Sequence, residues 1–251
     1  MEPYATGPQL WASGLVFLRA GAIVMLVPGL GETYVPVRAR LALALVLALC
    51  LGPIAAASLP PLPTGVGDMA GFVIKELLVG LMIGALMRMF IASLGVAGEL
   101  VSLQTTLSFA QTANPTQAQP GTILSTFLTL LGLTMVFDTG LHHLFLGAIA
   151  RSYTLFPPAR PLPINDAAAL AVQTTGKVFA LGLQLAAPVV AFSLVFNIAT
   201  GFVGRMMPQF QIFFVATPLS LLLGLSIFAL SLGSIGLVWL QGYEQFLHIF
   251  T

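Results

Sequence analysis

Few side chains in this sequence could do chemistry. His142 and His143 are adjacent, so on a helix they point about 100° apart and cannot form the i, i+4 pair of a zinc site. The third histidine, His248, lies far away near the last residue. The sequence has no G-x-S-x-G elbow, no phosphate-binding loop and no carboxylate pair at helical spacing within an apolar run. We therefore expect no catalytic residues, no metal site, no cofactor and no enzymatic activity.

The most unusual segment, residues 108–121, is polar, uncharged and interrupted by proline and glycine, and it lies between two long apolar runs. Irregular backbone is tolerated at membrane depth only where it is buried in protein or lines a water-filled space. The segment is therefore expected to be a filter, gate or plug. Its candidate residues are Phe109, Gln111, Asn114, Pro115, Gln117 and Pro120.

The composition indicates whether the rest of the chain folds in water or in a membrane. Hydrophobic residues make up 58% of the 251 residues and charged residues 7%, whereas a globular protein is about 25% charged. The mean hydropathy is +1.01. The net charge of +1 gives no basic patch for nucleic acid. These values predict an all-α integral membrane protein without a soluble domain.

About six hydrophobic helices are expected, each long enough to cross a hydrocarbon core about 30 Å thick. The third is too long for one span, so we expect a break near residues 93–98. The fifth begins after a proline-rich loop, with Asn165 or Asp166 as its cap. The predicted ranges are 9–30, 37–57, 68–107, 122–149, 165–203 and 213–250.

The last two predicted helices contain Pro188 and Pro218, which bend a helix. A short turn with Arg205 and Pro208 joins them. We expect a kinked hairpin in which Arg205 bonds carbonyl groups at the end of the fifth helix, where a cation is favoured by about 0.3 to 1 kcal/mol.

Charged residues inside the apolar runs should face protein or water, because a charge at the bilayer centre costs about 2.5 to 3.5 kcal/mol on insertion scales. Arg19 has three interpretations: a polar contact to a pore or partner, an ion pair with Glu76 or Glu99, or a side chain that reaches the membrane surface. Lys75 beside Glu76 is expected to mark a helix end near water. The candidate intramembrane polar residues are Arg19, Lys75, Glu76, Arg88 and Glu99.

Small residues mark two further features. Gly80 and Gly84, and also Gly201 and Gly204, offer faces for close helix packing. The only cysteine, Cys50, lies in an apolar run, which favours a buried structural thiol.

Four stretches in a fixed order resemble the FliR family of flagellar export-gate proteins, whose counterpart in virulence type III secretion is SctT. These stretches are Pro28-Gly29-Leu30-Gly31-Glu32 with 35–40, Ala97-Gly98-Glu99-Leu100 through Asn114-Pro115, the block from Ala187-Pro188 to 208–210, and 213–219. Together they span nearly the whole chain. One departure is Asn114, because the family commonly has an acidic residue before this central proline.

The resemblance implies a single membrane domain over 1–251, with N-terminal helices over 1–150, a plug loop over about 105–121 and a hairpin over 164–251 that resembles FliQ. It implies a structural, pore-forming subunit of the type III export apparatus in the bacterial inner membrane, at the flagellar basal body. The implied partners are FliP-like and FliQ-like proteins in one complex that rises out of the membrane plane, FlhB-like and FlhA-like components, unfolded secreted substrates and membrane lipid. The main alternative is a small-molecule transporter or permease subunit, although no second segment matches the central loop as a paired discontinuous helix would.

Overall fold

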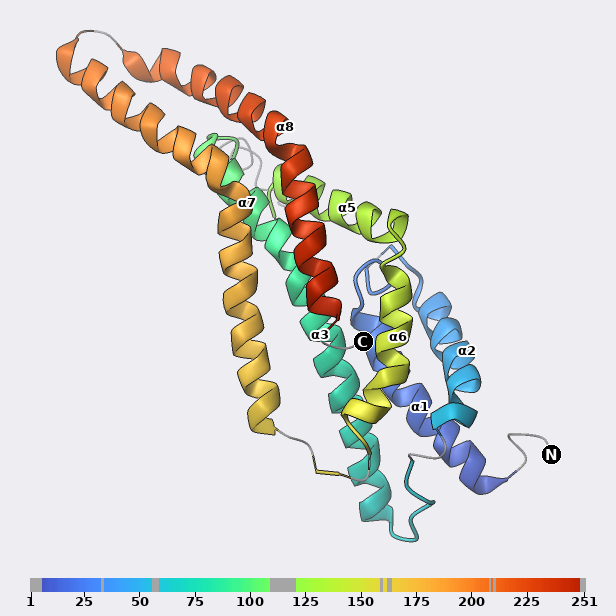
Figure 1. Ribbon diagram of the computed structural model, residues 1–251. Coiled ribbons are helices and arrows are strands. Elements are labelled where there is room, and N and C mark those ends of the chain that lie inside the picture. Colours follow the sequence, from blue (N-terminus) through green and yellow to red (C-terminus); the bar gives the residue numbers. More distant parts are fainter. Residues whose placement is uncertain are drawn as a thin grey trace. The chain divides into compact units, whose positions relative to one another are not determined.

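The structure is a computed structural model that describes residues 6–32, 34–55, 59–108, 121–158, 160–161, 164–207, 209 and 211–248. Helices dominate these ranges, which contain no strand, and the predicted all-α class is confirmed. The helices, labelled in Figure 1, are α1 (Gly7–Leu26), α2 (Val37–Ala55), α3 (Val66–Gln104), α5 (Ile123–Asp138), α6 (His142–Leu155), α7 (Ile164–Met206) and α8 (Ile212–Leu247).

The helices have the length and composition of membrane spans. Four of them, α1, α3, α7 and α8, are each apolar enough to cross a bilayer, and the pair α5 and α6 qualifies together as a fifth. The 43 residues of α7 extend about 65 Å at a rise of about 1.5 Å per residue. That is about twice the thickness of a hydrocarbon core. The protein is an all-α integral membrane protein with helices that exceed one perpendicular span.

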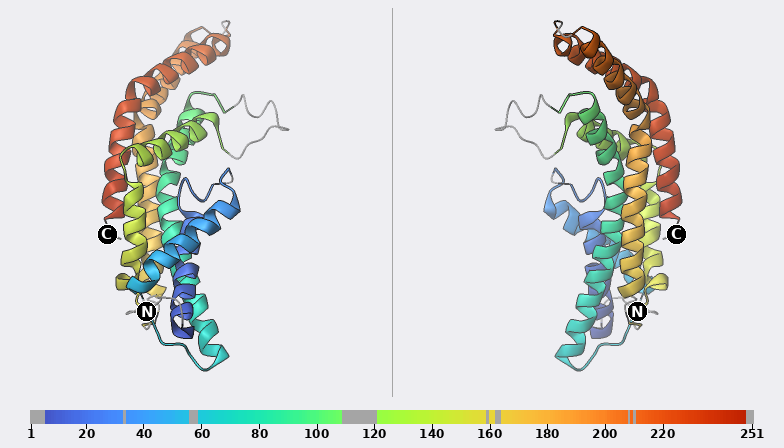
Figure 2. Two further views of the ribbon diagram at one scale, coloured as in Figure 1. Left: turned by 90° about the vertical axis from the view of Figure 1, so that its right-hand side faces the viewer. Right: turned by 90° about the vertical axis from the view of Figure 1, so that its left-hand side faces the viewer.

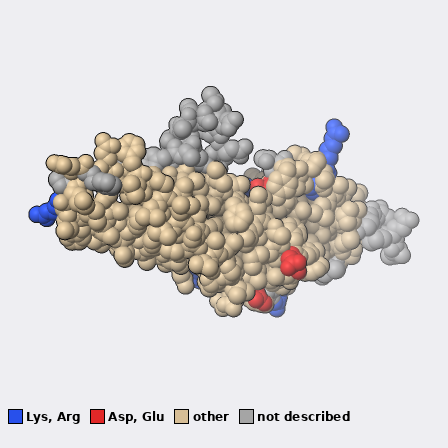
Figure 3. All heavy atoms as spheres, turned by 90° about the horizontal axis from the view of Figure 1, so that it is seen from above, with Lys and Arg blue, Asp and Glu red and all other residues tan. Residues whose placement is uncertain are grey.

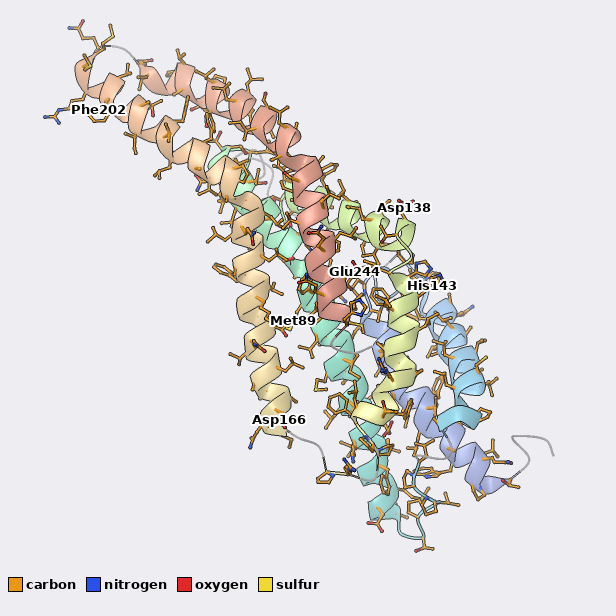
Figure 4. All side chains as sticks on the ribbon, in the orientation of Figure 1. Met89, Asp138, His143, Asp166, Phe202 and Glu244 are labelled. Atoms are coloured by element: carbon orange, nitrogen blue, oxygen red, sulfur yellow. The ribbon has the colours of Figure 1, made fainter. Side chains whose placement is uncertain are left out.

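Two predicted helix boundaries are wrong. The expected break near residues 93–98 does not exist, because α3 continues without interruption from Val66 to Gln104. The predicted helix over 122–149 is instead two helices, α5 and α6, separated at residues 139–141. Gly140 has φ 75° there, a backbone conformation that residues other than glycine rarely adopt. Asp138 and His143 flank this break in Figure 4.

Contacts divide the chain into two compact units. The first comprises residues 1–90, 137–175 and 244–251, and the second comprises 91–136 and 176–243. In the first unit, α1 packs against α2, and Tyr153 of α6 joins Val16 and Ala48 in a buried cluster. In the second unit, Trp239 of α8 is fully buried, and its Nε1 donates a hydrogen bond to Ser93 Oγ of α3 at 3.1 Å.

Gly80 and Gly84 bring α3 against α1, as the sequence predicts. A Cβ atom at Gly80 would lie 2.6 Å from the Arg19 carbonyl oxygen, and one at Gly84 would lie 2.8 Å from Leu26 Cβ. Only glycine fits a backbone approach this close. The second pair differs, because a Cβ at Gly201 meets no atom within 4 Å and one at Gly204 would meet Ile212 Cγ2 at an ordinary 3.7 Å.

Local sequence explains several helix ends. At the start of α1, the Thr6 backbone N–H donates to Gln9 Oε1 at 3.1 Å, which is half of a capping box. After α1, Val27 donates its N–H to the Ile23 carbonyl, and Pro28 prevents further helix. The prediction that Asn165 or Asp166 caps α7 is wrong, because α7 begins at Ile164 and both residues lie inside its first turn. Figure 4 labels Asp166 there.

Within the second unit, the C-terminal half of α7 and the N-terminal half of α8 run side by side as a hairpin in Figures 1 and 2. Pro188 and Pro218 lie inside these helices as expected. Uncharged residues, drawn in tan, make up most of the described surface in Figure 3, which fits a surface that meets lipid or other apolar helices.

Candidate functional site at the roots of the central loop

The candidate plug residues, Phe109, Gln111, Asn114, Pro115, Gln117 and Pro120, lie outside the described residues. The structure does describe both chain segments from which this loop leaves the helices. Both segments belong to the second unit. The geometry of these two roots is therefore the part of the site that the structure defines.

The first root is the end of α3. Thr106 has φ 60°, in the left-handed region that terminates helices, and its N–H donates to the Leu103 carbonyl at 3.4 Å. The Ser108 N–H donates to the Ser102 carbonyl at 3.2 Å. These bonds satisfy carbonyl groups that a helix end leaves without partners. The chain therefore turns sharply at Thr106 before the loop begins.

The second root is the start of α5. Gly121 has φ 108°, and Thr122 follows it as the cap, with its Oγ1 accepting the Ser125 N–H at 3.2 Å. The Thr122 N–H donates to Glu99 Oε1 of α3 at 2.8 Å. A carboxylate at this position also lies at the positive end of the α5 dipole. The side chain of Glu99 thus ties the returning chain to α3.

Gly98 allows α5 to lie close enough to α3 for the hydrogen bond between Thr122 and Glu99. A Cβ atom at Gly98 would overlap the backbone of Ser125, and the Thr122 hydroxyl reaches the Gly98 carbonyl at 3.5 Å. At this point α5 lies too close to α3 for any side chain at residue 98. Both roots of the loop are consequently held on the last two turns of α3.

The first root is also attached to α7 and α8. Ser193 Oγ donates to Gln104 Oε1 at 2.7 Å, and Asn197 Nδ2 donates to Ser193 Oγ at 3.2 Å. Thr105 faces Gly224 of α8, where a Cβ would collide with its methyl group. Sequence reasoning missed this polar network, because serine and asparagine in long apolar helices resemble ordinary packing residues. The signal that would have found it is the polar pair Ser193 and Asn197 at i, i+4 spacing.

Two of the candidate intramembrane polar residues, Arg19 and Glu76, form a buried ion pair in the first unit. Arg19 Nε lies 2.7 Å from Glu76 Oε2, both side chains are 0% exposed, and Arg19 Nη2 donates to Oε1 at 2.8 Å. Of the interpretations of Arg19 given above, the structure has the ion pair with Glu76. Glu99 is engaged elsewhere, with Thr122.

Arg19 also holds the end of α6. Its Nη1 donates to the Ser152 carbonyl at 2.8 Å and its Nη2 to the Phe156 carbonyl at 2.9 Å. The guanidinium carbon lies 4.2 Å from the centre of the Tyr153 ring, within the range of a cation–π interaction. A single side chain therefore joins α1, α3 and α6.

The two remaining intramembrane candidates, Lys75 and Arg88, are less buried than the Arg19–Glu76 pair. Lys75 Nζ donates to the carbonyl oxygens of Pro157 and Pro158 after α6. The prediction that Lys75 marks a helix end is wrong, because it lies within α3. Arg88 Nη2 lies 3.8 Å from Glu32 Oε2, and the two side chains are 49% and 28% exposed.

Of the hairpin residues, Pro188 lies inside α7, Pro218 lies inside α8 and Arg205 lies at the end of α7. Arg205 is exposed in the last turn of α7, where a cation is favoured. Pro208 lies outside the described residues. Phe202, labelled in Figure 4, lies on the same terminal part of α7 and is 64% exposed.

Groups that could bind a metal or react are dispersed. Within the described ranges, no three His, Cys, Asp or Glu side chains are close enough to hold an ion. The rings of His142 and His143 lie 4.1 Å apart beside Phe137. Cys50 is exposed on α2, which contradicts the expected burial. Apart from Arg38 and Arg40 near its start, α2 is apolar on every face, so hydropathy does not distinguish its covered face from its open one.

Comparison with known proteins gives one consistent family. The model of bacterial export proteins, family 1, matches residues 10–246. The flagellar biosynthetic protein FliR of Caulobacter vibrioides is 55% identical over 251 residues, which is 100% of both chains. FliR of Escherichia coli is 32% identical over 84% of this chain and 80% of its own length. FliR of Bacillus subtilis is 29% identical over 82% of this chain and 80% of its own.

Proposed function

Because the chain belongs to family 1 of the bacterial export proteins, we propose that it is a structural, pore-forming subunit of the type III export apparatus. In this role it helps form the channel through which unfolded flagellar proteins leave the cell, and its central loop closes that channel. It is a membrane component of the flagellar export machinery and carries out no reaction of its own. Its location is the inner membrane, at the flagellar basal body.

One observation carries the plug proposal: both roots of the loop are fixed on the same two turns of α3. Glu99 and Gly98 hold the α5 root, and the turn at Thr106 holds the α3 root. A loop with fixed ends loses less conformational entropy when it is seated than one with free ends. The fixed ends support the proposal that the loop returns to the same position each time it closes the channel.

The composition of the loop suits closure of a pore through which polypeptides pass. Residues 109–120 contain no charge, so they enter a narrow lumen without the cost of desolvating an ion. Glutamine and asparagine side chains can exchange hydrogen bonds to water for bonds to neighbouring loops. A seal made of many weak contacts is displaced by a substrate without breaking any strong bond.

The hairpin is the proposed surface for assembly with FliP-like and FliQ-like proteins. Large apolar side chains remain uncovered on both of its helices: Leu194 and Phe202 of α7 are 63% and 64% exposed, and Phe214 and Leu222 of α8 are 78% and 66% exposed. Apolar faces of this kind are stable only against lipid or other helices. FlhB-like and FlhA-like components would then attach to the assembled complex.

Purification of the tagged chain from its own membranes in mild detergent tests the proposal of a complex. We expect native mass measurement to show two further hydrophobic proteins bound to it in a fixed ratio. A transporter or permease subunit would purify alone or as a homodimer, and that result would contradict the proposed function.

A further inference from the structure

Two arginine side chains lie against one short turn that follows α1 in the first unit. The Val35 N–H closes this turn by donating to the Glu32 carbonyl at 3.1 Å. Arg40 of α2 donates from its Nη2 to the Val35 carbonyl at 3.0 Å. Arg88 of α3 places its Nη2 3.8 Å from Glu32 Oε2. Both guanidinium groups are therefore held at the same end of α1.

This end of the unit carries more positive than negative charge. Residues 27–41 and 77–90 contain Arg38, Arg40 and Arg88 but only one acidic residue, Glu32. Arg38 is exposed in the first turn of α2, and the Arg88 side chain is 49% exposed. The 3.8 Å between Arg88 and Glu32 is too long for a hydrogen bond, so the five N–H donors of this guanidinium stay largely available. The surface is therefore suited to an anion.

The surface beside these arginines is apolar. Large apolar side chains are exposed along the two helices that carry them: Leu41, Leu45 and Leu49 of α2, and Leu77, Leu78 and Leu81 of α3. The helix that ends at the level of the arginines, α1, has 20 residues and extends about 30 Å, which matches the thickness of a hydrocarbon core. The arginines thus lie where a helix of one membrane thickness ends.

We propose that Arg38, Arg40 and Arg88 bind the phosphate group of an anionic phospholipid, whose acyl chains lie along the exposed leucines of α2 and α3. A guanidinium group matches the geometry of a phosphate and can bond it through two N–H groups. Basic residues at the membrane surface also attract anionic lipids. The apolar surface begins directly beside the cations, which fits a lipid better than an acidic protein segment. This inference goes beyond the proposed function and does not depend on how the channel closes.

Native mass spectrometry tests the proposal on the purified protein with its co-purifying proteins in detergent, titrated with phosphatidylglycerol or phosphatidylcholine. The parent should bind the anionic phosphatidylglycerol more tightly. Each basic residue near the surface favours an anionic lipid by about 5-fold, so Arg38→Gln combined with Arg88→Gln should lower this preference by about 25-fold. Arg38→Lys combined with Arg88→Lys keeps both charges and should retain most of it. An unchanged preference in the glutamine variant would overturn the proposal.

The matched control combines Arg151→Gln with Arg160→Gln, which removes two exposed arginines from the same unit. It should keep the parental preference, and an equal loss there would refute a specific site. Should the double variant at Arg38 and Arg88 fail to fold, Arg88→Gln decides alone: a loss of about 5-fold supports the site, and a parental preference refutes it.

Two further measurements identify the occupant. Inorganic phosphate at constant ionic strength should not displace the bound lipid, because it has no acyl chains to lie on the leucines; displacement would show that the site takes a soluble anion instead. The assembled complex should prefer phosphatidylglycerol as the free chain does. A preference in the free chain alone would show that a partner protein covers the arginines, and the lipid would be refuted as their occupant.

Discussion

Removal of one member of the Arg19–Glu76 pair should destabilise the first unit strongly. Both side chains are 0% exposed, and two hydrogen bonds join them, at 2.7 and 2.8 Å. Breaking such a pair by removing one partner costs about 3 to 5 kcal/mol, because the other charge stays buried without compensation. Arg19→Leu and Glu76→Gln should therefore each lower the ratio of folded to unfolded chain by more than about 100-fold.

The double variant Arg19→Leu, Glu76→Leu should recover at least half of that loss. Replacing both members of a buried pair by apolar residues is often neutral or stabilising. Recovery should be incomplete, because the Phe156 carbonyl loses the donor that Arg19 supplied. The Ser152 carbonyl keeps the Phe156 N–H as a donor at 2.9 Å. An unsatisfied buried group costs about 1 to 3 kcal/mol, and because the Phe156 carbonyl is only part-buried, the expected deficit lies at the lower end of that range.

Thermal unfolding of the purified chain and complex in detergent measures these effects. Arg88→Leu is the matched control, since its ion pair with Glu32 spans 3.8 Å at side chains that are 49% and 28% exposed, and such pairs contribute about 0 to 1 kcal/mol. The reasoning is refuted if Arg19→Leu behaves like Arg88→Leu. It is also refuted if the double variant is as unstable as the sum of the two single variants.

Three further predictions follow from the described contacts. Gly80→Val should separate α1 from α3 and lower the yield of folded chain, whereas Gly201→Val, where no atom lies within 4 Å of the added Cβ, should be tolerated; protease resistance in membranes distinguishes them. Arg205→Glu should reduce the yield of assembled complex, because it places a negative charge at the negative end of the α7 dipole, but it should leave the leak of assembled complexes unchanged. A normal yield would show that Arg205 has no role in assembly. Cys50, exposed on α2, should react with a membrane-permeant maleimide in the solubilised free chain, and resistance there would place α2 in a covered position.

The sequence predicts the helices well because apolar length is what a bilayer requires. It also predicts the close packing at Gly80 and Gly84 and includes Glu76 among the partners of Arg19. These successes share one cause. A charge or a glycine within an apolar helix has few acceptable environments, so its neighbours are constrained strongly.

The remaining features depend on glycines and hydroxyl groups whose roles a single sequence leaves ambiguous. The length of the third predicted helix suggests a break near residues 93–98, but the structure has a continuous helix there, in which Gly98 contacts Ser125. Gly140 does separate two helices, although nothing in the sequence distinguishes it from Gly98. The exposure of Cys50 and the network of Gln104 and Ser193 depend on which helix faces meet, and hydropathy carries no information on that point.

The conductance of complexes that lack residues 111–119 tests the central claim most directly. The complex should assemble with normal stoichiometry, because the roots at Thr106 and Thr122 and the hairpin are retained, and it should conduct ions without substrate. An assembled complex that is as tight as the parent would contradict the account. The seal would then lie in apolar side chains of the partner subunits, and the central loop would only connect α3 to α5.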